Sequence, residues 1–559
     1  MQQLIECVPN FSEGRNPEII KAITEAIQSV ESVQLLDVDP GKATNRTVVT
    51  FVGAPDDVVE AAFRGIQKAA ELIDMRAHSG AHPRMGATDV CPMIPISGIT
   101  IEETVAYAKK LGEKVGKELQ IPVYLYESAA STPDRRNLAV IRAGEYEGFG
   151  KKIKEKKWKP DFGPAKIGAA GATVIGVRDF LIAYNINLNT TSVRRANSVA
   201  FDIREKGRIK RKGNPILGEI VKDKEGNPLR TPGSLKGVKA IGWYIEEYGI
   251  AQVSMNITDI RSVPLHIAFE ESQKSAIRRG MVVSGSELVG MVPLKVLTDA
   301  GKYFLRKQKR STGVSEKELI HIAVKSMGLD DLVPFDPAQK IIEYSLRQNG
   351  GRLVDMNLVD FADLTASEAP APGGGSIAAY VGALGASLGA MVGNLSAGKR
   401  GWENRINYFS SYAEQGQEIK RQLLHLVDED TLAFTQIMNA FRMPKATDED
   451  KKARSQAIQE ATIYATQIPL KTMEVAFESI ELCKAMAKKG NPNSISDAAV
   501  GALCTKTAIQ GAWLNVRINA KDIKDEVIKN QILEKAKAIA KKTDSAVNGI
   551  LRTVNNVIG

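Results

Sequence analysis

The chain has 559 residues, of which 43% are hydrophobic and 25% charged, and a formal net charge of +10. This composition is that of a soluble globular protein, and the length predicts three or four domains of about 150 residues each. The positive charge is widely spread and forms no basic stripe interleaved with aromatic residues, which argues against a nucleic-acid partner and suits anionic small molecules.

The four cysteines, at positions 7, 91, 483 and 504, are far apart and show no CxxC spacing. This spacing argues against a zinc site and a disulfide framework, and it favours a reducing cytoplasm. Residues 1–6 lack the basic region and the apolar run of a signal peptide, so we expect a cytoplasmic protein.

The first 130 residues predict a β-α-β-β-α-β order of elements. The expected elements are a strand at 4–9, a helix that begins at Asn16 and Pro17, a hairpin of strands at 33–38 and 47–52, a helix from Pro55 to about Leu72, and a strand at 121–126. This order indicates a split βαβ layer, with helices on one face of a mixed sheet.

Residues 76–89 carry two of the five histidines, His78 and His82, together with Arg84 and Asp89. Glycines and a proline predict a loop here rather than a helix. A histidine beside an arginine indicates acid–base chemistry on a carboxylate-bearing substrate, whereas the plainer interpretation is a polar turn with one capping histidine. The apolar, proline-broken residues 90–96 that follow predict an edge strand or a pocket wall.

Polar side chains also stand at the predicted strand ends, at Asn10, Glu13, Asp39 and Arg46. Each alone is typical of a solvated turn. Loops above a rigid sheet are where sites usually form, so together with the histidine loop they predict a pocket for a carboxylate-bearing amine.

Residues 151–159 are strongly basic, and a solvated charge run is the default interpretation. They lead into a loop rich in glycine and alanine at 160–173, which lets the backbone approach a flat ligand closely. The loop contains neither a GxGxxG motif nor a P-loop, so the sequence does not indicate a nucleotide.

The same order of elements recurs between 180 and 335. It consists of a strand at 180–188, a helix at 191–206, a hairpin at 240–245 and 250–257, a helix from Pro264 to Arg279, and a basic helix at 302–310. We therefore expect two similar α+β layers, with a small-molecule site between such layers.

From about residue 357 no strand pattern recurs. Residues 377–395 are long and apolar enough to span a membrane, but they are rich in Ala and Gly and contain Ser387 and Asn394. Four glycines at 382, 385, 389 and 393 form a stripe that lets a helix approach closely, so we predict a buried bundle helix and no membrane span. Gly373, Gly374, Gly375 and Ser376 precede it as a possible anion seat.

Three amphipathic helices are expected after it, at 405–443, 448–468 and 470–489. Asp428 and Asp430 interrupt a leucine-rich face of the first, and their spacing of two points them to different sides. Asp430 is the better candidate for an inward carboxylate, although an ordinary surface acid is the commoner case.

Eight short segments together closely resemble the formimidoyltransferase-cyclodeaminase family of bifunctional folate enzymes in histidine breakdown. They are ECVPNFSEG (6–14), TNRT (44–47), HPRMGA (82–87), DVCP (89–92), RAGEYE (142–147), DFGP (161–164), PGGGS (372–376) and DEDTLAF (428–434). They cover nearly the whole chain in the family's order.

The resemblance implies two α+β, βαββαβ-like formiminotransferase subdomains at 1–179 and 180–335, a linker at 336–356, and an all-α helical-bundle cyclodeaminase domain at 357–559. It places the catalytic histidine at His82 and the cyclodeaminase aspartate at Asp430. The folate loop falls on about Gly163 to Gly171, with Gly163, Pro164, Gly168 and Gly171 as contacts, and is a residue shorter than the family's.

The implied chemistry has two steps. N-formimino-L-glutamate donates its formimino group to N5 of tetrahydrofolate, and ring closure then gives 5,10-methenyltetrahydrofolate and ammonia. His82 would transfer protons in the first step and Asp430 in the second. From residue type, we expect Arg46 or Arg84 to hold a glutamate carboxylate, Asp39 to orient the imidazole and Asn10 to line the pocket. No metal is needed.

Two alternatives stay open, namely a glutamate formyltransferase that uses N-formylglutamate and a non-enzymatic folate-binding scaffold. The glycine stripe and the family both imply a homo-oligomer. The positive charge further predicts that polyglutamylated tetrahydrofolate is preferred, with residues 151–159 and Lys399 and Arg400 as candidate contacts for the tail.

Overall fold

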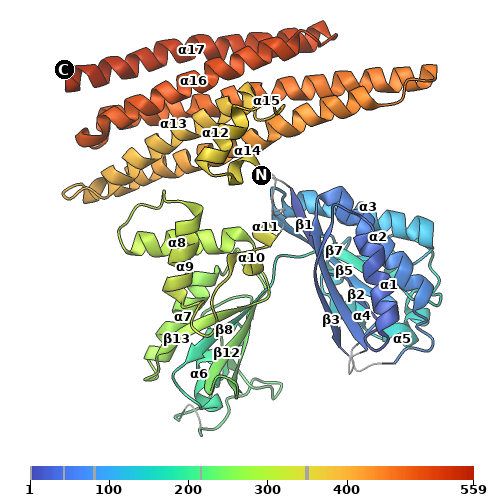
Figure 1. Cartoon of the computed structure of the whole chain (residues 1–559). Coiled ribbons are helices and arrows are strands. Elements are labelled where there is room, and N and C mark those ends of the chain that lie inside the picture. Colours follow the sequence, from blue (N-terminus) through green and yellow to red (C-terminus); the bar gives the residue numbers. More distant parts are fainter. Residues whose placement is uncertain (1–2, 42–44, 80–82, 215–216, 346–351) are drawn as a thin grey trace. The chain divides into compact units, whose positions relative to one another are not determined.

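The structure, a computed structural model, describes residues 3–41, 45–79, 83–214, 217–345 and 352–559 (Figure 1). It divides into two compact units. One comprises Met1–Val296 and Met327–Leu346, and the other comprises Leu297–Ser326 and Arg347–Gly559.

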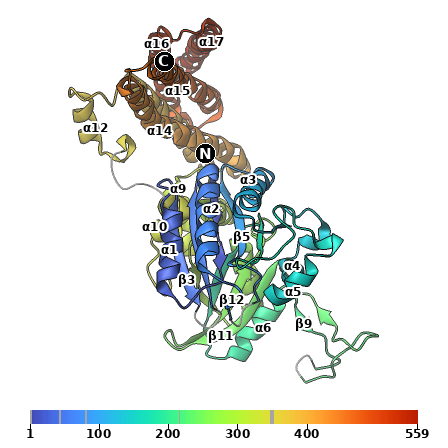
Figure 2. The same cartoon turned by 90° about the vertical axis from the view of Figure 1, so that its right-hand side faces the viewer.

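The first subdomain is built on a mixed sheet of seven strands (Figure 2). Its antiparallel core has the spatial order β3 (Gln34–Gly41), β4 (Arg46–Gly53), β1 (Leu4–Cys7) and β5 (Thr88–Ser97). The short β2 (Asn10–Phe11) pairs with β4 and β5, while β7 (Thr173–Val177) and β6 (Val123–Glu127) extend the sheet in parallel. The predicted hairpin and mixed sheet are therefore confirmed.

Helices cover the first sheet, and their starts follow the sequence signals. Asn16 caps α1 (Pro17–Gln28) by accepting the Glu18 N–H, and α2 (Pro55–Leu72) begins at its proline. A capping box at Thr100 begins α3 (Ile101–Lys114). Ile23 and Ile27 of α1 are buried in the core that these three helices form with the sheet. Two shorter helices, α4 (Leu138–Arg142) and α5 (Glu145–Lys152), follow β6.

The expectation of an edge strand at 90–96 was wrong. β5 lies inside the sheet, between β1 and β2 on one side and β7 on the other. Pro92 lies opposite Val8 and Pro9, where the chain passes from β1 to β2 and the hydrogen-bond ladder with β5 is interrupted. The sheet therefore tolerates a proline here. The Pro92 carbonyl still accepts the Val8 N–H at 3.1 Å.

The second subdomain repeats the core of the first. The chain order is β8 (Ile182–Leu188), α6 (Val193–Ile203), β11 (Val238–Ile245), β12 (Ile250–Ile257), α7 (Leu265–Ile277) and β13 (Val283–Val289). Its four antiparallel strands lie in the order β11-β12-β8-β13. This arrangement matches β3-β4-β1-β5, so the predicted repeat of a βαββαβ layer is confirmed. A short pair, β9 (Arg208–Ile209) and β10 (Arg230–Thr231), lies outside this sheet.

In the division into compact units, residues 297–326 belong to the same unit as the helical part. They include most of α8 (Leu294–Lys307) and α9 (Glu316–Met327). The carbonyl of Gly313 accepts hydrogen bonds from Asn394 (2.8 Å) and Gln417 (3.0 Å), and Lys302 pairs with Glu414 at 2.9 Å. Two small helices, α10 (Pro337–Lys340) and α11 (Ile342–Ser345), follow α9 in the chain.

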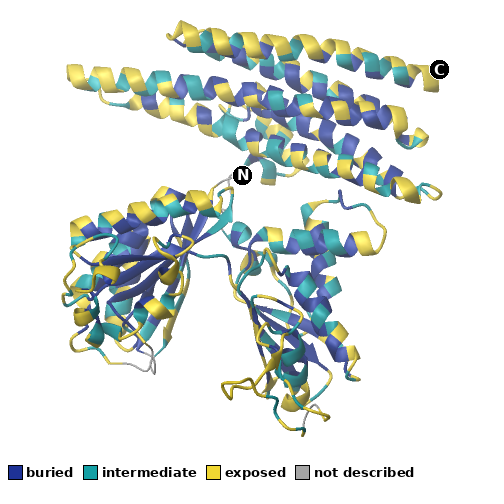
Figure 3. Cartoon of the chain, turned by 180° about the vertical axis from the view of Figure 1, so that it is seen from behind, coloured by how far each residue is buried: buried dark blue, intermediate teal, exposed yellow. Residues whose placement is uncertain are grey.

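The last part is all helical, as expected. Its helices are α12 (Leu358–Thr365), α13 (Gly374–Ala397), α14 (Ile406–Arg442), α15 (Asp448–Lys489), α16 (Ile495–Ala520) and α17 (Glu526–Ile558). The long helices turn buried faces toward one another and exposed faces outward (Figure 3). The glycines of α13 do permit close approach, but to three neighbours rather than one, because a methyl group at Gly385, Gly389 or Gly393 would meet α16, α15 or α14 respectively.

The predicted break between two helices at Pro469 was wrong, since α15 continues through it as one helix of 42 residues. Proline has no N–H to donate to the carbonyl of Ala465, four residues earlier. Asn519 of α16 replaces this donor, with Nδ2 at 2.8 Å from the Ala465 oxygen.

Within the described part of the chain, α13 is the one helix long and apolar enough to cross a membrane. Of its most apolar window, 61% is buried among the other helices. A core helix of a bundle has this character.

Candidate functional site

The first candidate site lies where β2, β4 and β5 meet the loop at 76–89. His82 itself lies outside the described residues. The loop upstream of it is fixed by Asn45, whose Nδ2 donates to the Ser79 carbonyl at 2.9 Å while its Oδ1 accepts the Gly14 N–H at 3.0 Å. Asn45 is buried and has a φ of 48°, a left-handed conformation that asparagine tolerates.

His78 uses both ring nitrogens within the protein. Its Nδ1 accepts the Nε–H of Arg84 at 3.2 Å, so Nε2 carries the proton and donates to the Asn45 carbonyl at 3.0 Å. His78 is therefore the capping histidine of the plainer interpretation. Of the two histidines in the loop, His82 is left as the candidate for proton transfer.

Arg84 is buried and engaged with internal partners. Its guanidinium pairs with Glu145 at 2.8 Å and with Glu147 at 2.7 Å, and it also donates to the His78 carbonyl. The hydrogen bonds from Arg84 hold the pKa of Glu147 below its usual value. Arg84 thus ties the loop to α5, an arrangement that does not favour the expected contact with a substrate carboxylate.

A second arginine, Arg142 at the end of α4, reaches the site instead. Its Nη2 lies 2.6 Å from Asp89, which is 1% exposed and also accepts the Met85 N–H at 3.0 Å. Burial raises the pKa of Asp89, although Arg142 and Arg46 act to lower it. Arg46 donates to the side chain of Asn10, so two residues predicted for the pocket are in contact.

The predicted folate loop packs against the downstream side of the histidine loop. The Ala172 N–H donates to the Met85 carbonyl, and the Ala87 N–H donates to the Ala170 carbonyl at 2.8 Å. Gly171 has a φ of 73°, and a side chain there would collide with the Met85 carbonyl. Met75 is tied to the same loop, since its N–H donates to Ala169 at 2.9 Å.

The other residues of the predicted folate loop are more exposed to solvent. Gly163 is exposed, with a φ of 78°, and a side chain there would collide with the Ile121 carbonyl. Pro164 is half-buried, and Gly168 is exposed and accepts the Tyr146 hydroxyl at 3.2 Å. Asp39 is exposed on β3 opposite Val48, and its role in orienting His82 stays a prediction.

The second candidate site lies at the start of α13. Asp430 of α14 accepts the Ser376 hydroxyl at 2.8 Å and also the Ser376 N–H. A side chain at Gly375 would collide with Asp430, so glycine is required for the carboxylate to reach the helix start. Burial raises the pKa of Asp430, and the two hydrogen bonds from Ser376 oppose the rise.

The sequence predicted an anion-binding site at the start of α13. In the structure, the anion at this position is the carboxylate of Asp430, which belongs to the chain itself. Gly373 is the N-cap and provides no side-chain bond. A methyl group at Gly374 would lie 3.3 Å from Nδ2 of Asn515, which places α16 beside the turn. Asn515 was missed because a half-buried asparagine inside a helix gives no sequence signal.

Asp428 has a different task from Asp430. Its carboxylate accepts the Leu353 N–H at 2.9 Å, which fixes the short 3-10 turn Leu353–Asp355 against α14. The two aspartates therefore point to different partners, as their spacing predicts.

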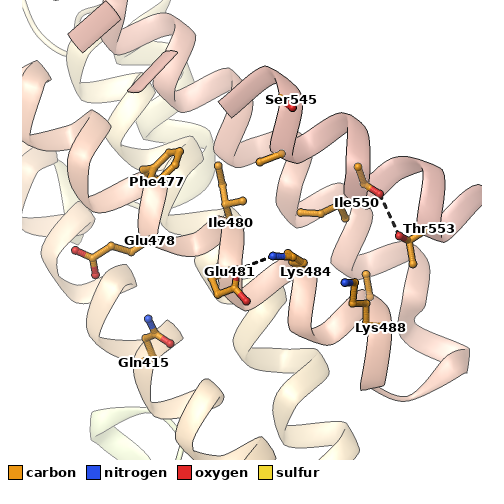
Figure 4. Close-up of a pocket in the computed structure, with 13 residues that line it drawn as sticks. Gln415, Phe477, Glu478, Ile480, Glu481, Lys484, Lys488, Ser545, Ile550 and Thr553 are labelled. Atoms are coloured by element: carbon orange, nitrogen blue, oxygen red, sulfur yellow. Dashed lines mark hydrogen bonds and ion pairs between the residues drawn. The ribbon is translucent and has the colours of Figure 1, made fainter. Parts of the chain in front are cut away.

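A cavity of about 600 Å³ lies elsewhere in the helical part, between α14, α15 and α17 (Figure 4). Its lining surface is mostly apolar, and two of the lining residues, Lys484 and Glu481, form an ion pair at 3.2 Å. None of the predicted site residues lines it. Among the residues that the structure describes, which do not include His82, no group of three His, Cys, Asp or Glu side chains is placed to hold a metal ion.

Three family models match consecutive parts of the chain. Residues 4–178 match the N-terminal subdomain of the formiminotransferase domain, residues 183–347 match the formiminotransferase domain, and residues 357–538 match formiminotransferase-cyclodeaminase. Asp89 and Arg142 both lie in sequence segments that resemble the family, at 89–92 and 142–147. Their residue types alone did not indicate a role for either of them.

Curated relatives match the whole chain or one part of it. A formimidoyltransferase-cyclodeaminase of Mus musculus is 44% identical over 534 residues, which are 95% of each chain. A glutamate formimidoyltransferase of Thermoplasma acidophilum is 45% identical over 305 residues, covering 54% of this chain and 92% of the relative. A methenyltetrahydrofolate cyclohydrolase of Methylorubrum extorquens is 37% identical over 198 residues, covering 35% of this chain and 95% of the relative.

Proposed function

Because the chain belongs to the formimidoyltransferase-cyclodeaminase family, we propose that it catalyses both reactions of that name. It transfers the formimino group of N-formimino-L-glutamate to tetrahydrofolate, and it closes the product to 5,10-methenyltetrahydrofolate with release of ammonia. The observation that carries this proposal is the 44% identity to the mouse relative. The match covers 95% of each chain, so it includes both the formiminotransferase part and the cyclodeaminase part.

In the transfer step, N5 of tetrahydrofolate loses a proton as it attacks the amidine carbon, and the glutamate nitrogen gains one as it leaves. One imidazole with a pKa near neutrality serves both purposes, a contribution of roughly 10²–10⁴-fold. His82 takes this role, because His78 already uses both ring nitrogens within the protein. The loop from Gly163 to Gly171 takes the folate.

In the ring closure, N10 attacks the formimino carbon and the nitrogen departs as ammonia. The departing nitrogen needs a proton, and a carboxyl group whose pKa is raised by burial is suited to supply it. Asp430 takes this role. Ser376 and Gly375 orient its carboxylate at the start of α13.

A second activity is favoured for the helical part by its 37% identity to a methenyltetrahydrofolate cyclohydrolase over 95% of that relative. Water attacks the methenyl carbon in such a hydrolysis, at the same carbon that ring closure joins to N10. We expect slow hydrolysis of supplied methenyltetrahydrofolate above the rate without enzyme. A rate that Asp430→Asn leaves unchanged would assign it to another site.

The two other candidate functions are not favoured. The relatives are named as formimidoyltransferases, which does not favour a formyl donor or a non-enzymatic scaffold. The direct test is to incubate the chain with tetrahydrofolate and N-formimino-L-glutamate and to measure methenyl absorbance and free ammonia. Transfer from N-formylglutamate alone would contradict the proposal.

The proposal includes a cytoplasmic homo-oligomer that uses polyglutamylated tetrahydrofolate without a metal. Cys7 and Cys91 are free thiols with sulfur atoms 3.5 Å apart, which suits a reducing compartment. Exposed apolar side chains on neighbouring helices support association between copies. They are Leu384, Met391 and Leu395 of α13 and Val500, Leu503, Leu514 and Ile518 of α16.

A further inference from the structure

The sheet of the second subdomain has one face that α6 does not cover, which we call the open face. α6 packs against the other face, where a side chain at Gly242 of β11 would collide with the backbone of Ala196 and Asn197. Because side chains alternate along a strand, Ile241 and Trp243 point to the open face, and they are 55% and 39% exposed. The inner strands present buried amides to this face instead of apolar side chains, which indicates a polar function. They are Asn185 and Asn187 of β8 and Gln252 of β12.

Hydrogen bonds join these amides in a single row across the sheet. The indole N–H of Trp243 donates to Gln252 at 3.1 Å, and Gln252 donates to Asn187 at 2.8 Å. Asn187 in turn donates to Asp331 at 3.0 Å. On β13, Gly285 occupies the position opposite Asn187, and a side chain there would collide with Asp331. The row therefore holds the Trp243 ring, an exposed aromatic surface, in one orientation.

The next row of the open face contains a carboxylate without a cation. Ser254, Asn185 and Glu287 lie opposite one another in the register of β12, β8 and β13. Asn185 donates to Oε2 of the half-buried Glu287 at 3.0 Å, and Glu287 has no ion pair among the described residues. Tyr248, in the turn between β11 and β12, lies near it, since the charge of Glu287 raises the pKa of Tyr248. The other carboxylate oxygen, Oε1, is thus available to a ligand.

The charges of the open face indicate which kind of ligand it takes. Glu287 and Asp331 are both acidic. Lys239 on β11, the edge strand opposite Glu287, is the one cation that the four strands, all of them described, turn to this face. A donor with two carboxylates is disfavoured here. A flat, uncharged ring with two adjacent N–H groups fits instead, because a carboxylate accepts two parallel N–H bonds and an indole offers a flat ring an aromatic surface.

We propose that the open face binds the pteridine ring of tetrahydrofolate, with Glu287 accepting its 2-amino group and the neighbouring ring N–H. Asn185 is the positioning residue that orients this carboxylate, and Trp243 lies against the flat half of the ring. The inference rests on the proposed transfer function. The loop at 163–171 then takes another part of the same folate.

The test compares tetrahydrofolate with its 2-desamino-2-methyl analogue, which lacks one of the two N–H donors. We measure kcat and KM of transfer by the full-length chain with each folate at saturating N-formimino-L-glutamate. Kd is measured for the 5-formyl derivative of each, from the fluorescence change that is lost in Trp243→Phe. In the unsubstituted protein the analogue should lose about 10- to 100-fold in kcat/KM and in affinity, the range of one charged hydrogen bond.

In Glu287→Ala, that penalty should shrink to within about threefold, while KM for N-formimino-L-glutamate stays unchanged. Glu287→Gln keeps a neutral acceptor and should show an intermediate penalty. It also serves if Glu287→Ala does not fold. Asn185→Ala should weaken the discrimination although the carboxylate is still present, because nothing then orients it.

Glu205→Ala is the matched control, since the Glu205 carboxylate also accepts one hydrogen bond, from the Gly237 N–H at 2.9 Å. It should keep the full penalty. If Glu287→Ala loses the same factor with both folates, Glu287 is only structural and the proposal is wrong. A raised KM for the donor with the full analogue penalty would assign Glu287 to the formimino group and would also overturn it. If the unsubstituted protein transfers nothing, the proposed function fails, and the Kd comparison still decides whether the open face binds the pteridine.

Discussion

Asp430 is subject to two opposing influences on its pKa. Burial raises the pKa, and the hydroxyl and N–H of Ser376 oppose the rise by stabilising the carboxylate. If Asp430 gives a proton to the departing nitrogen, ring closure is fast below its pKa and slows as the pH rises through it. Ser376→Ala removes one hydrogen bond to the carboxylate, so we expect the falling limb of the pH–kcat profile to move to higher pH.

Supplied 5-formiminotetrahydrofolate isolates this step for the measurement. Thr365→Ala, which removes an exposed hydroxyl on α12, is the control and should leave the profile in place. A profile in which ring closure speeds up as the pH rises would show that the carboxylate acts as a base. A profile that Ser376→Ala moves to lower pH would show that Ser376 does not stabilise the carboxylate of Asp430.

Glu6 on β1 is a buried carboxyl whose pKa burial raises to about 7, against an attraction to Arg178 that lowers it. Below pH 4.5 the group is protonated in both the folded and the unfolded chain. Between pH 4.5 and 7 only the unfolded chain ionises, so the free energy of unfolding falls as pH rises. The loss amounts to about 3 kcal/mol, at about 1.4 kcal/mol for each pH unit.

Glu6→Gln removes this titration. The variant should therefore resist unfolding better than the parent chain at pH 8, and the difference should vanish near pH 4.5. Hydrogen exchange of β1 and β5 across this pH range measures it locally, which avoids the assumption of a single unfolding transition. Equal slopes for the two proteins would contradict the assignment.

Residue type and motif predicted a set of candidate site residues, but not the internal partners of each side chain. The pairing of Asp89 with Arg142 joins positions 53 apart, and Arg84 reaches Glu147 across 63. Such contacts depend on how α4 and α5 fold back on the sheet. For that reason Arg84 was expected to be available to a substrate, and Arg142 received no role.

At the scale of elements, α15 depends on a donor from another helix. Pro469 leaves the buried carbonyl of Ala465 without its helical partner, and Asn519 supplies the bond. Asn519→Ala should lower the free energy of unfolding of the helical part by about 1–3 kcal/mol, the cost of an unsatisfied buried acceptor. In a Pro469→Ala background, residue 469 regains its N–H, so the same substitution should cost less than about 1 kcal/mol.

Thermal unfolding of the full-length chain and hydrogen exchange along α15 measure this double-mutant cycle. Asn439→Ala, an exposed asparagine on α14, is the control and should change little. An Asn519→Ala cost that is the same in both backgrounds would mean that Asn519 does not compensate for the proline.

Periodicity and caps predicted the repeated βαββαβ order and several helix starts, but not α3, α16 or α17. Two of the features that were predicted are wrong, and both are at prolines. Pro92 and Pro469 both remove an N–H, and in each case a distant part of the chain decides the outcome. The break between β1 and β2 accommodates the first, and Asn519 accommodates the second. Neither of these compensating contacts can be predicted from the sequence around the proline.

At the scale of the molecule, the basic run at 151–159 is only partly solvated. Lys152 closes α4, and Lys157 pairs with Asp134 at 2.7 Å. Lys159 is exposed as well, and so are Lys151, Lys154 and Lys156, three candidates to attract a polyglutamate tail. Replacing these three by Gln should reduce the preference for polyglutamylated over monoglutamyl tetrahydrofolate.

The preference in the parent chain should also shrink as salt rises, because exposed charges are screened within about 8 Å at physiological ionic strength. Kd values for both tail lengths at low and high salt measure it. An unchanged preference in the triple variant would leave these lysines with a role in solubility alone.

The proposed function requires two sites on separate parts of the chain, at His82 in the first unit and at Asp430 in the second. The most direct test compares His82→Ala, Asp430→Asn and a mixture of the two variants, all supplied with tetrahydrofolate and N-formimino-L-glutamate. His82→Ala should make no 5-formiminotetrahydrofolate but should close the supplied intermediate at nearly the parent rate. Asp430→Asn should accumulate the intermediate and release little ammonia.

The mixture should restore methenyltetrahydrofolate and ammonia, because the intermediate made by one variant is closed by the other. Asp428→Asn is the matched control and should retain both activities. Near-parental transfer by His82→Ala, or loss of both activities in either single variant, would contradict two independent sites in one chain.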